Sequence, residues 1–259
     1  MPDFETLTFA QSGPVTSIVL NRPEAANGMN STLTRELAVA AALCDTHATK
    51  VVTITGAGRF FSAGGDLKSI AAAPSAGAFV KGIADDLHRA LSTFARMDAV
   101  VITAVNGVAA GAGFSLAVTG DLVVSAESAK FTMAYTKAGL SPDGSSSYYL
   151  PRLIGIRRTQ QLMLTNRTLS AAEALDWGLV TEVVPDAELT ARTEALAQEM
   201  ATTSRTSNSV VKQLLLGTYR TPIEEQMELE GRLIAECAES ADGQEGVAAF
   251  LGKRPPQFG

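Results

Sequence analysis

Short apolar runs alternate along the first three quarters of the chain with longer segments whose apolar residues recur every three or four positions. The short runs are rich in β-branched residues and predict strands. They are Val15–Leu20, Val51–Thr55, Val100–Val105, Asp121–Ser125 and Leu179–Val184. The longer segments predict amphipathic helices. Because strands separated by helices are typical of parallel sheets, the pattern predicts an α/β fold.

Start and stop signals place several of these helices. Asn30 or Ser31 can cap a helix, and a second apolar stripe runs from Ile83 to Met97. Ser170–Glu173 has the spacing of a capping box, and Gly178 suits the end of that helix. After about Pro185 only helices are indicated, and Thr221–Glu224 combines a capping box with a proline at the first helical position. No low-complexity linker separates this region from the rest, so we expect it to pack on the same body.

Composition narrows the class of protein. The chain has 259 residues, 46% of them hydrophobic, and a formal net charge of −6, which argues against a nucleic-acid partner. Its 2 cysteines exclude a disulfide scaffold and a Cys/His zinc cluster. Its longest apolar stretches are far shorter than the roughly 20 residues of a membrane span. The acidic start Met1–Glu5 lacks the cationic region of a signal peptide, so we expect a cytoplasmic protein with no membrane partner.

Two glycine-rich segments each follow a predicted strand. Arg59–Leu67 comes after Val51–Thr55, and Asn106–Phe114 comes after Val100–Val105. The first N–H groups of a helix have no partner within it, so such turns can hold an anion or a developing oxyanion. The alternative is that the small residues only permit close packing of helix and strand. Neither segment has the Gly-Lys-Ser/Thr that would indicate a Walker A loop.

A few polar residues add candidate chemistry, each with a structural alternative. Asp143 in Ser-Pro-Asp-Gly fits a β-turn that caps a helix over Ser145–Leu150. His88 fits a partly buried, hydrogen-bonded helix histidine, and His47 a solvated residue near a helix end. Trp177 fits the core better than a ligand contact. The residues alone therefore yield two possible oxyanion turns, one carboxylate and one imidazole.

Those residues resemble the enoyl-CoA hydratase/isomerase (crotonase) superfamily along nearly the whole chain. The resemblance rests on an ordered set of segments at the family's spacing. They are Asn21–Pro23, Phe61–Leu67, Val105–Gly113, Asp121, Ala129–Phe131, Gly139–Pro142, Ala174–Val180 and Phe250–Phe258. The resemblance implies an α/β fold with a ββα-spiral (superhelix) core over residues 1–200. It also implies a helical trimerisation region over 201–259, packed on the core or on a neighbouring subunit.

The same resemblance implies an acyl-CoA thioester substrate, with coenzyme A entering only as part of it and with no prosthetic group or metal. The two oxyanion N–H donors map to Gly65 and Ala112, where alanine replaces the usual glycine but keeps its N–H. The coenzyme A contacts map to Ala25, Ala63, Asp66 and Leu67. The basic tail at Lys253 and Arg254 is placed to meet a coenzyme A phosphate of a neighbouring subunit. A homotrimer or a dimer of trimers is expected.

Departures from the family pattern decide the predicted chemistry. Hydratases carry two glutamates, but the matching positions here are Ser115 and Tyr135, which argues against ordinary water addition. Asp143 matches the catalytic aspartate of dienoyl-CoA and epoxyphenylacetyl-CoA isomerases. It also matches the nucleophilic aspartate of 4-chlorobenzoyl-CoA dehalogenase, in which a histidine at the position of His88 activates water.

Three functions follow as hypotheses. The first is an acyl-CoA isomerase in which Asp143 moves a proton, while Ser115 and Tyr135 shape the pocket or hydrogen-bond the aspartate. The second is substitution on an aromatic acyl-CoA, with Asp143 as nucleophile and His88 as base. The third is an acyl-CoA-binding protein without catalysis.

Overall fold

The predicted strands meet in one six-stranded sheet in the computed structural model, which describes residues 3–46 and 48–259. Neighbouring strands of this sheet pair in parallel, apart from the antiparallel hairpin of the first two. In spatial order the strands are β1 (Leu7–Ser12), β2 (Val15–Leu20), β3 (Val51–Gly56), β5 (Val100–Val105), β7 (Leu122–Ala126) and β10 (Glu182–Val184). His47, expected to be solvated, lies outside the described residues.

A second, four-stranded sheet was not predicted. Its strands, in spatial order, are β4 (Phe60–Ser62), β6 (Val108–Ala110), β8 (Lys130–Thr132) and β9 (Leu169–Ser170). Strands of two or three residues are too short to show an alternating pattern. Each glycine-rich segment contains one of these strands, and β4 pairs directly with β6. The two segments are therefore joined side by side.

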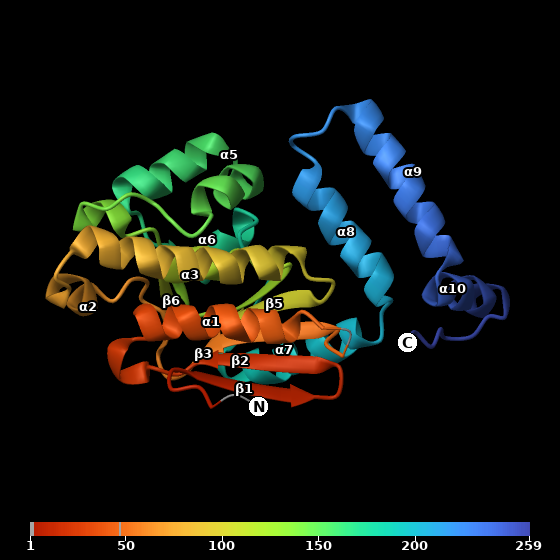
Figure 1. Cartoon of the computed structure of the whole chain (residues 1–259), viewed down its shortest axis with the longest axis horizontal. Helices are drawn as coiled ribbons and strands as arrows, with labels where there is room; N and C mark the ends of the chain where they lie inside the picture. The colour runs from red at the N-terminus through yellow and green to blue at the C-terminus, as the bar shows by residue number, and fades with distance from the viewer. Residues whose placement is uncertain (1–2, 47) are drawn as a thin grey trace.

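Helices surround the sheets, and Figure 1 shows α1 running alongside α3. α7 packs against β3 and β5, while α8 contacts α3. The α-helices are α1 (Ser31–Cys44), α2 (Leu67–Ala72), α3 (Ala76–Arg96), α4 (Ala112–Ala117), α5 (Ser146–Thr165), α6 (Ala171–Asp176), α7 (Leu189–Ala201), α8 (Arg205–Gly217), α9 (Ile223–Glu239) and α10 (Ala241–Leu251). Short 3-10 turns are η1 (Pro23–Ala25), η2 (Tyr135–Ala138) and η3 (Asp186–Glu188).

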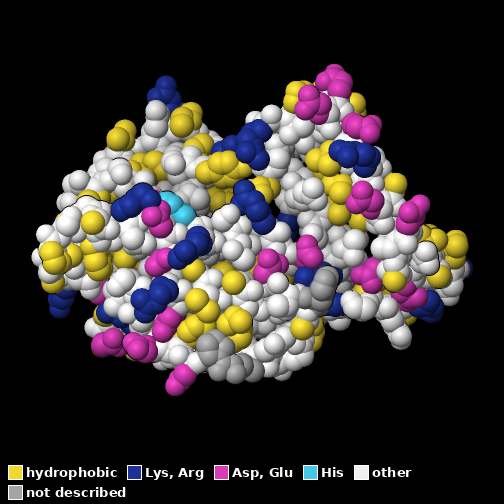
Figure 2. Space-filling view, viewed as in Figure 1, with side chains coloured by type: hydrophobic (Ala, Val, Ile, Leu, Met, Phe, Trp, Pro, Cys, Tyr) yellow, Lys and Arg dark blue, Asp and Glu magenta, His cyan; other side chains and the backbone are white. Residues whose placement is uncertain are grey.

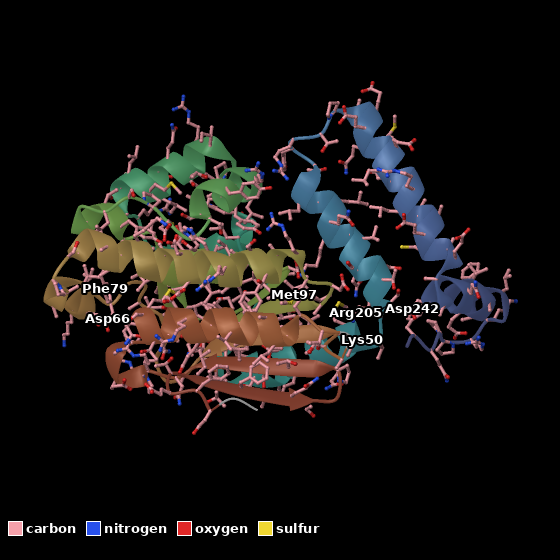
Figure 3. All side chains as sticks on the ribbon, in the orientation of Figure 1. Lys50, Asp66, Phe79, Met97, Arg205 and Asp242 are labelled. Carbon is pink, nitrogen blue, oxygen red and sulfur yellow. The ribbon has the colours of Figure 1, made fainter. Side chains whose placement is uncertain are left out.

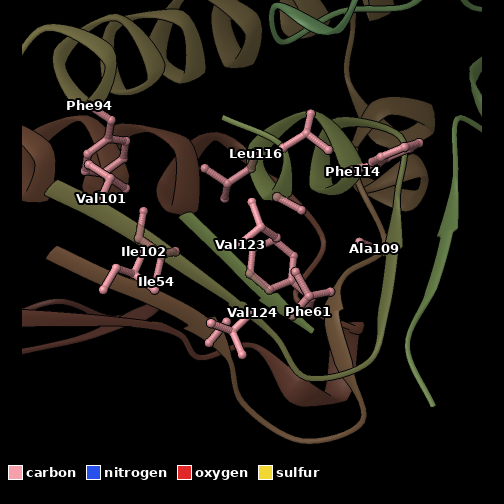
Figure 4. Packing of buried hydrophobic residues seen from close by; sticks show 14 of the residues in the cluster. Ile54, Phe61, Phe94, Val101, Ile102, Ala109, Phe114, Leu116, Val123 and Val124 are labelled. Atoms are coloured by element: carbon pink, nitrogen blue, oxygen red, sulfur yellow. The ribbon is translucent and has the colours of Figure 1, made fainter. Parts of the chain in front are cut away.

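The main core lies between the sheets and these helices. All residues of β5 are buried, as its continuous apolar run predicts for a central strand. Figure 4 shows Phe61 of β4 near Val123 of β7. The buried rings of Phe114 on α4 and Phe131 on β8 lie 5.7 Å apart between centroids. Buried side chains thus tie the short strands and α4, which carry the glycine-rich segments, to the large sheet.

The local signals were right at some helix ends and wrong at others. Asn30 caps α1 by accepting from the N–H of Leu33, and Ser170 with Glu173 forms the predicted capping box of α6. The capping box predicted at Thr221 is wrong, because the Thr221 hydroxyl donates back to the carbonyl of Gly217 instead.

Some predicted boundaries also need correction. The last strand of the large sheet begins at Glu182 rather than at Leu179, because the Leu179 N–H still bonds to the carbonyl of Ala174 in α6. The helix predicted over Ser145–Leu150 continues to Thr165 as α5. It passes a break at Gly155, whose φ of 75° is outside the helical region.

The C-terminal helices α8 to α10 extend to one side of the body (Figure 1). α8 is fixed to it by Lys212, whose ammonium group donates to the carbonyls of Phe94 and Ala99 and pairs with Asp121. Figure 3 shows Arg205 at the start of α8, where it pairs with Asp98. Within the described residues, no helix is long and apolar enough to cross a membrane. The division at residue 200 stays a prediction.

Candidate active site

A mainly apolar cavity of about 420 Å³ lies where the two glycine-rich segments meet α3 and the loop before α5. Both proposed oxyanion residues and the candidate carboxylate line it. The lining also includes Lys81, Ile83 and Leu87 of α3. The predicted site residues in its wall are Ala63, Gly65, Leu67, Ala112, Tyr135 and Asp143.

The backbone of the two glycine-rich segments is fixed by close contacts. Gly64 has φ of 87°, and a Cβ there would lie 2.6 Å from the carbonyl oxygen of Ala110. Gly111, the N-cap of α4, has φ of 52° with ψ of −125°, a conformation open essentially to glycine. Gly64 therefore has to be glycine because the two segments approach closely there, and Gly111 because of its backbone conformation. The close approach brings the segment of Gly65 next to the segment of Ala112.

The N–H groups of Gly65 and Ala112 are available to a ligand. Among the described residues, neither N–H donates a hydrogen bond. The β-bridge between Met29 and Gly65 does not use the Gly65 N–H, because the Met29 N–H donates to the Gly64 carbonyl and the Asp66 N–H donates to the Met29 carbonyl. Ala112 is the first residue of α4, so its N–H has no partner within the helix. Both residues line the same cavity, as an oxyanion site requires.

Asp143 is held at the cavity by its own main chain. Its carbonyl oxygen accepts hydrogen bonds from the Ser115 hydroxyl at 2.7 Å, the Ser146 hydroxyl at 3.0 Å and the Tyr135 hydroxyl at 3.2 Å. Ser115 is fully buried and is not part of the cavity lining. It therefore lies behind the pocket wall rather than in it, with its hydroxyl on the main chain of Asp143.

Tyr135 keeps its proton throughout the physiological range. Burial raises the pKa of its hydroxyl, and the nearby Asp143 charge acts in the same direction. The neutral hydroxyl remains a hydrogen-bond donor to the Asp143 carbonyl. It lines the cavity as a protonated hydroxyl and not as a phenolate base.

His88 reaches the candidate carboxylate. Its Nε2 lies 2.8 Å from Oδ1 of Asp143, although α3 carries the histidine and the loop before α5 carries the aspartate. The two side chains are 48% and 37% exposed. His88 is absent from the lining of the 420 Å³ cavity, so it contacts Asp143 from the other side.

The residues matched to coenzyme A contacts divide into two groups. Ala63 and exposed Leu67 line the cavity, whereas Ala25 and Asp66 do not. Asp66 caps α2 through the Ser69 N–H and pairs with Arg22 at 3.1 Å, at the end of the molecule near α2 (Figure 3). Burial opposes its ionisation, but these bonds outweigh burial and lower the pKa of Asp66. A structural role accounts for its position.

The basic tail is already partly engaged. Arg254 forms an ion pair with Glu245, whose pKa it lowers to about 2 together with the Gln257 N–H.

Trp177 was expected in the core. It is half-buried and packs against the core from outside, with the guanidinium groups of Arg158 and Arg167 over its ring. Over residues 3–46 and 48–259, no three His, Cys, Asp or Glu side chains form a group suited to a metal ion.

Sequence reasoning missed the parts of the site that depend on tertiary packing. Gly144 has φ of 63° and lies against Ser115, and Lys81 is the basic residue of the described cavity lining. The sequence Asp143-Gly144 predicts a turn, but it does not indicate that the turn packs against Ser115.

Comparison with known proteins finds relatives over nearly the whole chain. Residues 10–259 match the family described as Enoyl-CoA hydratase/isomerase. The chain is 39% identical over 258 residues to a 1,2-epoxyphenylacetyl-CoA isomerase of Escherichia coli, with 97% of each chain covered. It is 35% identical over 260 residues to a carnitinyl-CoA dehydratase of Salmonella typhi, again with 97% of each covered. A crystal structure of enoyl-CoA hydratase from Bacillus anthracis superposes with a TM-score of 0.92 at 29% identity, covering 98% of this chain and 99% of that one.

Proposed function

Because the chain belongs to the enoyl-CoA hydratase/isomerase family, we propose that it is an acyl-CoA isomerase that uses Asp143 as its acid and base. The carrying observation is the composition of the cavity wall. Asp143 is the one carboxylate among its described lining residues, and it shares the wall with the free N–H groups of Gly65 and Ala112. Water addition of the hydratase type uses an acid/base pair, whereas moving a proton within one substrate needs a single base.

The reaction is a proton transfer in two steps. The Asp143 carboxylate takes a proton from a carbon beside the thioester or further along the acyl chain. The electrons of that C–H bond move into the conjugated system and place negative charge on the thioester oxygen. The N–H groups of Gly65 and Ala112 stabilise this charge, and one such donor is typically worth ~3–4 kcal/mol. Protonated Asp143 then returns the proton to another carbon, which shifts the double bond or alters a ring.

The test compares wild type with Asp143→Asn on an unsaturated acyl-CoA in D₂O. We expect wild type to isomerise the substrate and exchange deuterium into it, and the variant to lose about a hundredfold or more of both rates. Asp86→Asn is the matched control, because Asp86 lies on α3, pairs with Arg89 and does not line the cavity. No exchange by wild type, or equal exchange by the Asp143 variant, would overturn the proposal. Tight binding without turnover across a panel of acyl-CoA thioesters would favour a binding protein.

The contact between His88 and Asp143 favours one alternative, hydrolytic substitution on an aromatic acyl-CoA. In that reaction the Asp143 carboxylate attacks the ring carbon and displaces its substituent with the bonding electron pair. His88 then takes a proton from water that hydrolyses the resulting aryl ester. This alternative predicts that His88→Gln accumulates a covalent adduct on Asp143, visible as a mass increase of the intact protein. An isomerase without this activity shows no adduct with a para-substituted benzoyl-CoA.

The same proposal includes coenzyme A binding at the α2 end and a homotrimer. Large apolar side chains on the C-terminal helices are exposed, among them Leu215, Met227, Ile234 and Phe250. Exposed apolar surface of this kind marks an interface between proteins. Sedimentation equilibrium should give three or six times the mass of 27.0 kDa. A monomer at micromolar concentration would remove the trimer from the proposal.

A further inference from the structure

A second cavity lies on the opposite side of His88 from the substrate cavity of about 420 Å³. It has a volume of about 350 Å³ and is formed by α3, α5 and the end of α8. Several polar side chains line it, among them Ser92, Arg96, Ser145 and Tyr148. A cavity of this size with polar groups in its wall is suited to hold water, whereas the substrate cavity is mainly apolar.

The wall between the two cavities is formed by α3 and by the loop before α5. Among the described residues, none lines both cavities. On α3, Leu87 lines the substrate cavity and the next residue, His88, lines the second one, since neighbouring residues on a helix point about 100° apart. In the loop, Asp143 lines the substrate cavity and Ser145 the second one. Gly144 between them has φ of 63°, which turns the chain from one side of the wall to the other.

The contact between Asp143 and His88 crosses this wall. His88 Nε2 lies 2.8 Å from Asp143 Oδ1, and in the described part of the chain this is the only hydrogen bond to the carboxylate. The imidazole side chain is 48% exposed, and its Nδ1 has no hydrogen-bond partner among the described residues. Figure 2 shows a histidine side chain in cyan at the surface above α3. One ring nitrogen therefore faces the candidate base, and the other is open to water.

A bound acyl group changes what the Asp143 carboxyl group can reach. The reacting carbon has to lie against the carboxylate, so the substrate covers the side of Asp143 that lines the substrate cavity. The proton that Asp143 takes from the substrate can then return to the substrate or cross to His88. Imidazole both accepts and donates protons near neutral pH. A proton crosses a hydrogen bond without an open passage between the two cavities.

We propose that His88 is the route by which the proton on Asp143 exchanges with water during isomerisation. This role rests on the isomerase function and specifies how its proton is handled. The O–H bond of protonated Asp143 breaks, and an N–H bond forms at Nε2 of neutral His88, whose own hydrogen is on Nδ1. The imidazolium exchanges its N–H protons with water in the second cavity and returns a solvent proton to the carboxylate, so no proton is gained or lost. His88 acts through Asp143 and is a positioning residue of the site.

The test measures the deuterium carried by each product molecule when an unsaturated acyl-CoA is isomerised in D₂O, sampled before the product reacts again. Wild type should place deuterium in most product molecules. In His88→Gln the deuterium content per product should fall at least about threefold, because an amide can donate to the carboxylate but cannot carry a proton. Ser92→Ala is the matched control and should keep the wild-type content. Ser92 lines the second cavity one turn along α3 from His88, and its hydroxyl accepts from Arg96.

The deuterium content per product separates proton exchange from a structural role of His88. A structural role would lower isomerisation and exchange together and leave this content unchanged. That result, or an equal fall in Ser92→Ala, would overturn the role of His88 and leave the isomerase function standing. Glutamine is a good helix former and His88 is half exposed, so the variant should fold. His88→Asn, which cannot carry a proton either, should show the same fall. A complete loss of isomerisation in both variants, with the circular dichroism spectrum of wild type, would overturn the role as well.

Two other outcomes concern the isomerase function itself. Wild type that neither isomerises the substrate nor exchanges deuterium into it removes the isomerase function, and the role of His88 with it. A covalent adduct on Asp143 in His88→Gln would indicate aromatic substitution instead, and would also overturn the proton route.

Discussion

Replacing Gly144 with alanine tests whether the backbone around Asp143 sets the activity. Gly144 follows the candidate base and has φ of 63°. A Cβ at this position would lie 2.8 Å from the Cβ of Ser115 and 3.5 Å from Cδ2 of Leu87. Ser115 is fully buried on α4 and cannot move away without disturbing that helix. The alanine therefore strains the turn and pushes it away from Ser115.

The expected cost has two parts that can be measured separately. A non-glycine residue at positive φ loses about 1–2 kcal/mol. Forcing an extra methyl into a filled space adds typically 1–3 kcal/mol. Gly13, in the turn between β1 and β2, has φ of 56° and nothing within 4 Å of where a Cβ would lie, so Gly13→Ala carries the first cost alone. Gly144→Ala should lose about 2–5 kcal/mol of unfolding free energy, and Gly13→Ala about 1–2 kcal/mol.

Urea unfolding of both variants measures these costs, and isomerase assays measure the effect on function. We expect kcat to fall at least about tenfold in Gly144→Ala, because the shift moves Asp143 relative to the Gly65 and Ala112 N–H groups. Gly13→Ala should keep the wild-type kcat. Equal stability losses in the two variants would refute the steric argument. An unchanged kcat in Gly144→Ala would show that the turn does not position the base.

Two further predictions concern how the fold is held together. Lys212→Met removes the ammonium group that pairs with Asp121 at 2.8 Å and binds two carbonyls, so we expect urea unfolding to show a loss of about 3–5 kcal/mol. Lys81→Met, which breaks the exposed pair with Asp85, should cost less than about 1 kcal/mol. Comparable losses in the Lys212→Met and Lys81→Met variants would contradict the view that the buried Lys212–Asp121 pair stabilises the fold. Burial opposes ionisation of Glu36, but hydrogen bonds from Thr6 and the Glu5 N–H outweigh burial and lower the pKa of Glu36. The stability that the Glu36 carboxylate contributes is therefore present above the ordinary pKa of 4.5 and is lost as the pH falls below that value. The stability gap between wild type and Glu36→Gln should therefore be largest near neutral pH and shrink in acid, and a gap constant with pH would contradict this.

Sequence patterns predicted those parts of the fold that depend on residues near one another in the chain. The cap at Asn30 and the box at Ser170 each use a side chain three positions from its partner, so the sequence contains the whole interaction. The error at Thr221 has the same origin. Its hydroxyl had a competing acceptor at Gly217, and local spacing does not rank two acceptors that are both within reach.

Contacts between distant parts of the chain limit how much of the site can be predicted from the sequence. The resemblance to the family indicated Asp143 and His88, which are 55 positions apart, but only the structure brings them to 2.8 Å. It also separates residues that the sequence treated alike: Tyr135 lines the cavity, whereas Ser115 lies behind it. Arg96 and Arg220 both line the second cavity between α3, α5 and the end of α8, and no spacing rule groups residues so far apart in the chain.

The positions of Ser115 and Tyr135 explain why a single carboxylate is sufficient for the proposed chemistry. The family resemblance places the two hydratase glutamates at these positions. Here both residues direct a hydroxyl to the carbonyl oxygen of Asp143, at 2.7 Å and 3.2 Å. The two sites that would carry an acid/base pair therefore fix the backbone of the one remaining base. Glutamate at position 115 would remove the shortest of the hydroxyl bonds to the Asp143 carbonyl. Restoring the glutamates should then weaken isomerisation without creating a hydratase, because the present packing is built around Asp143.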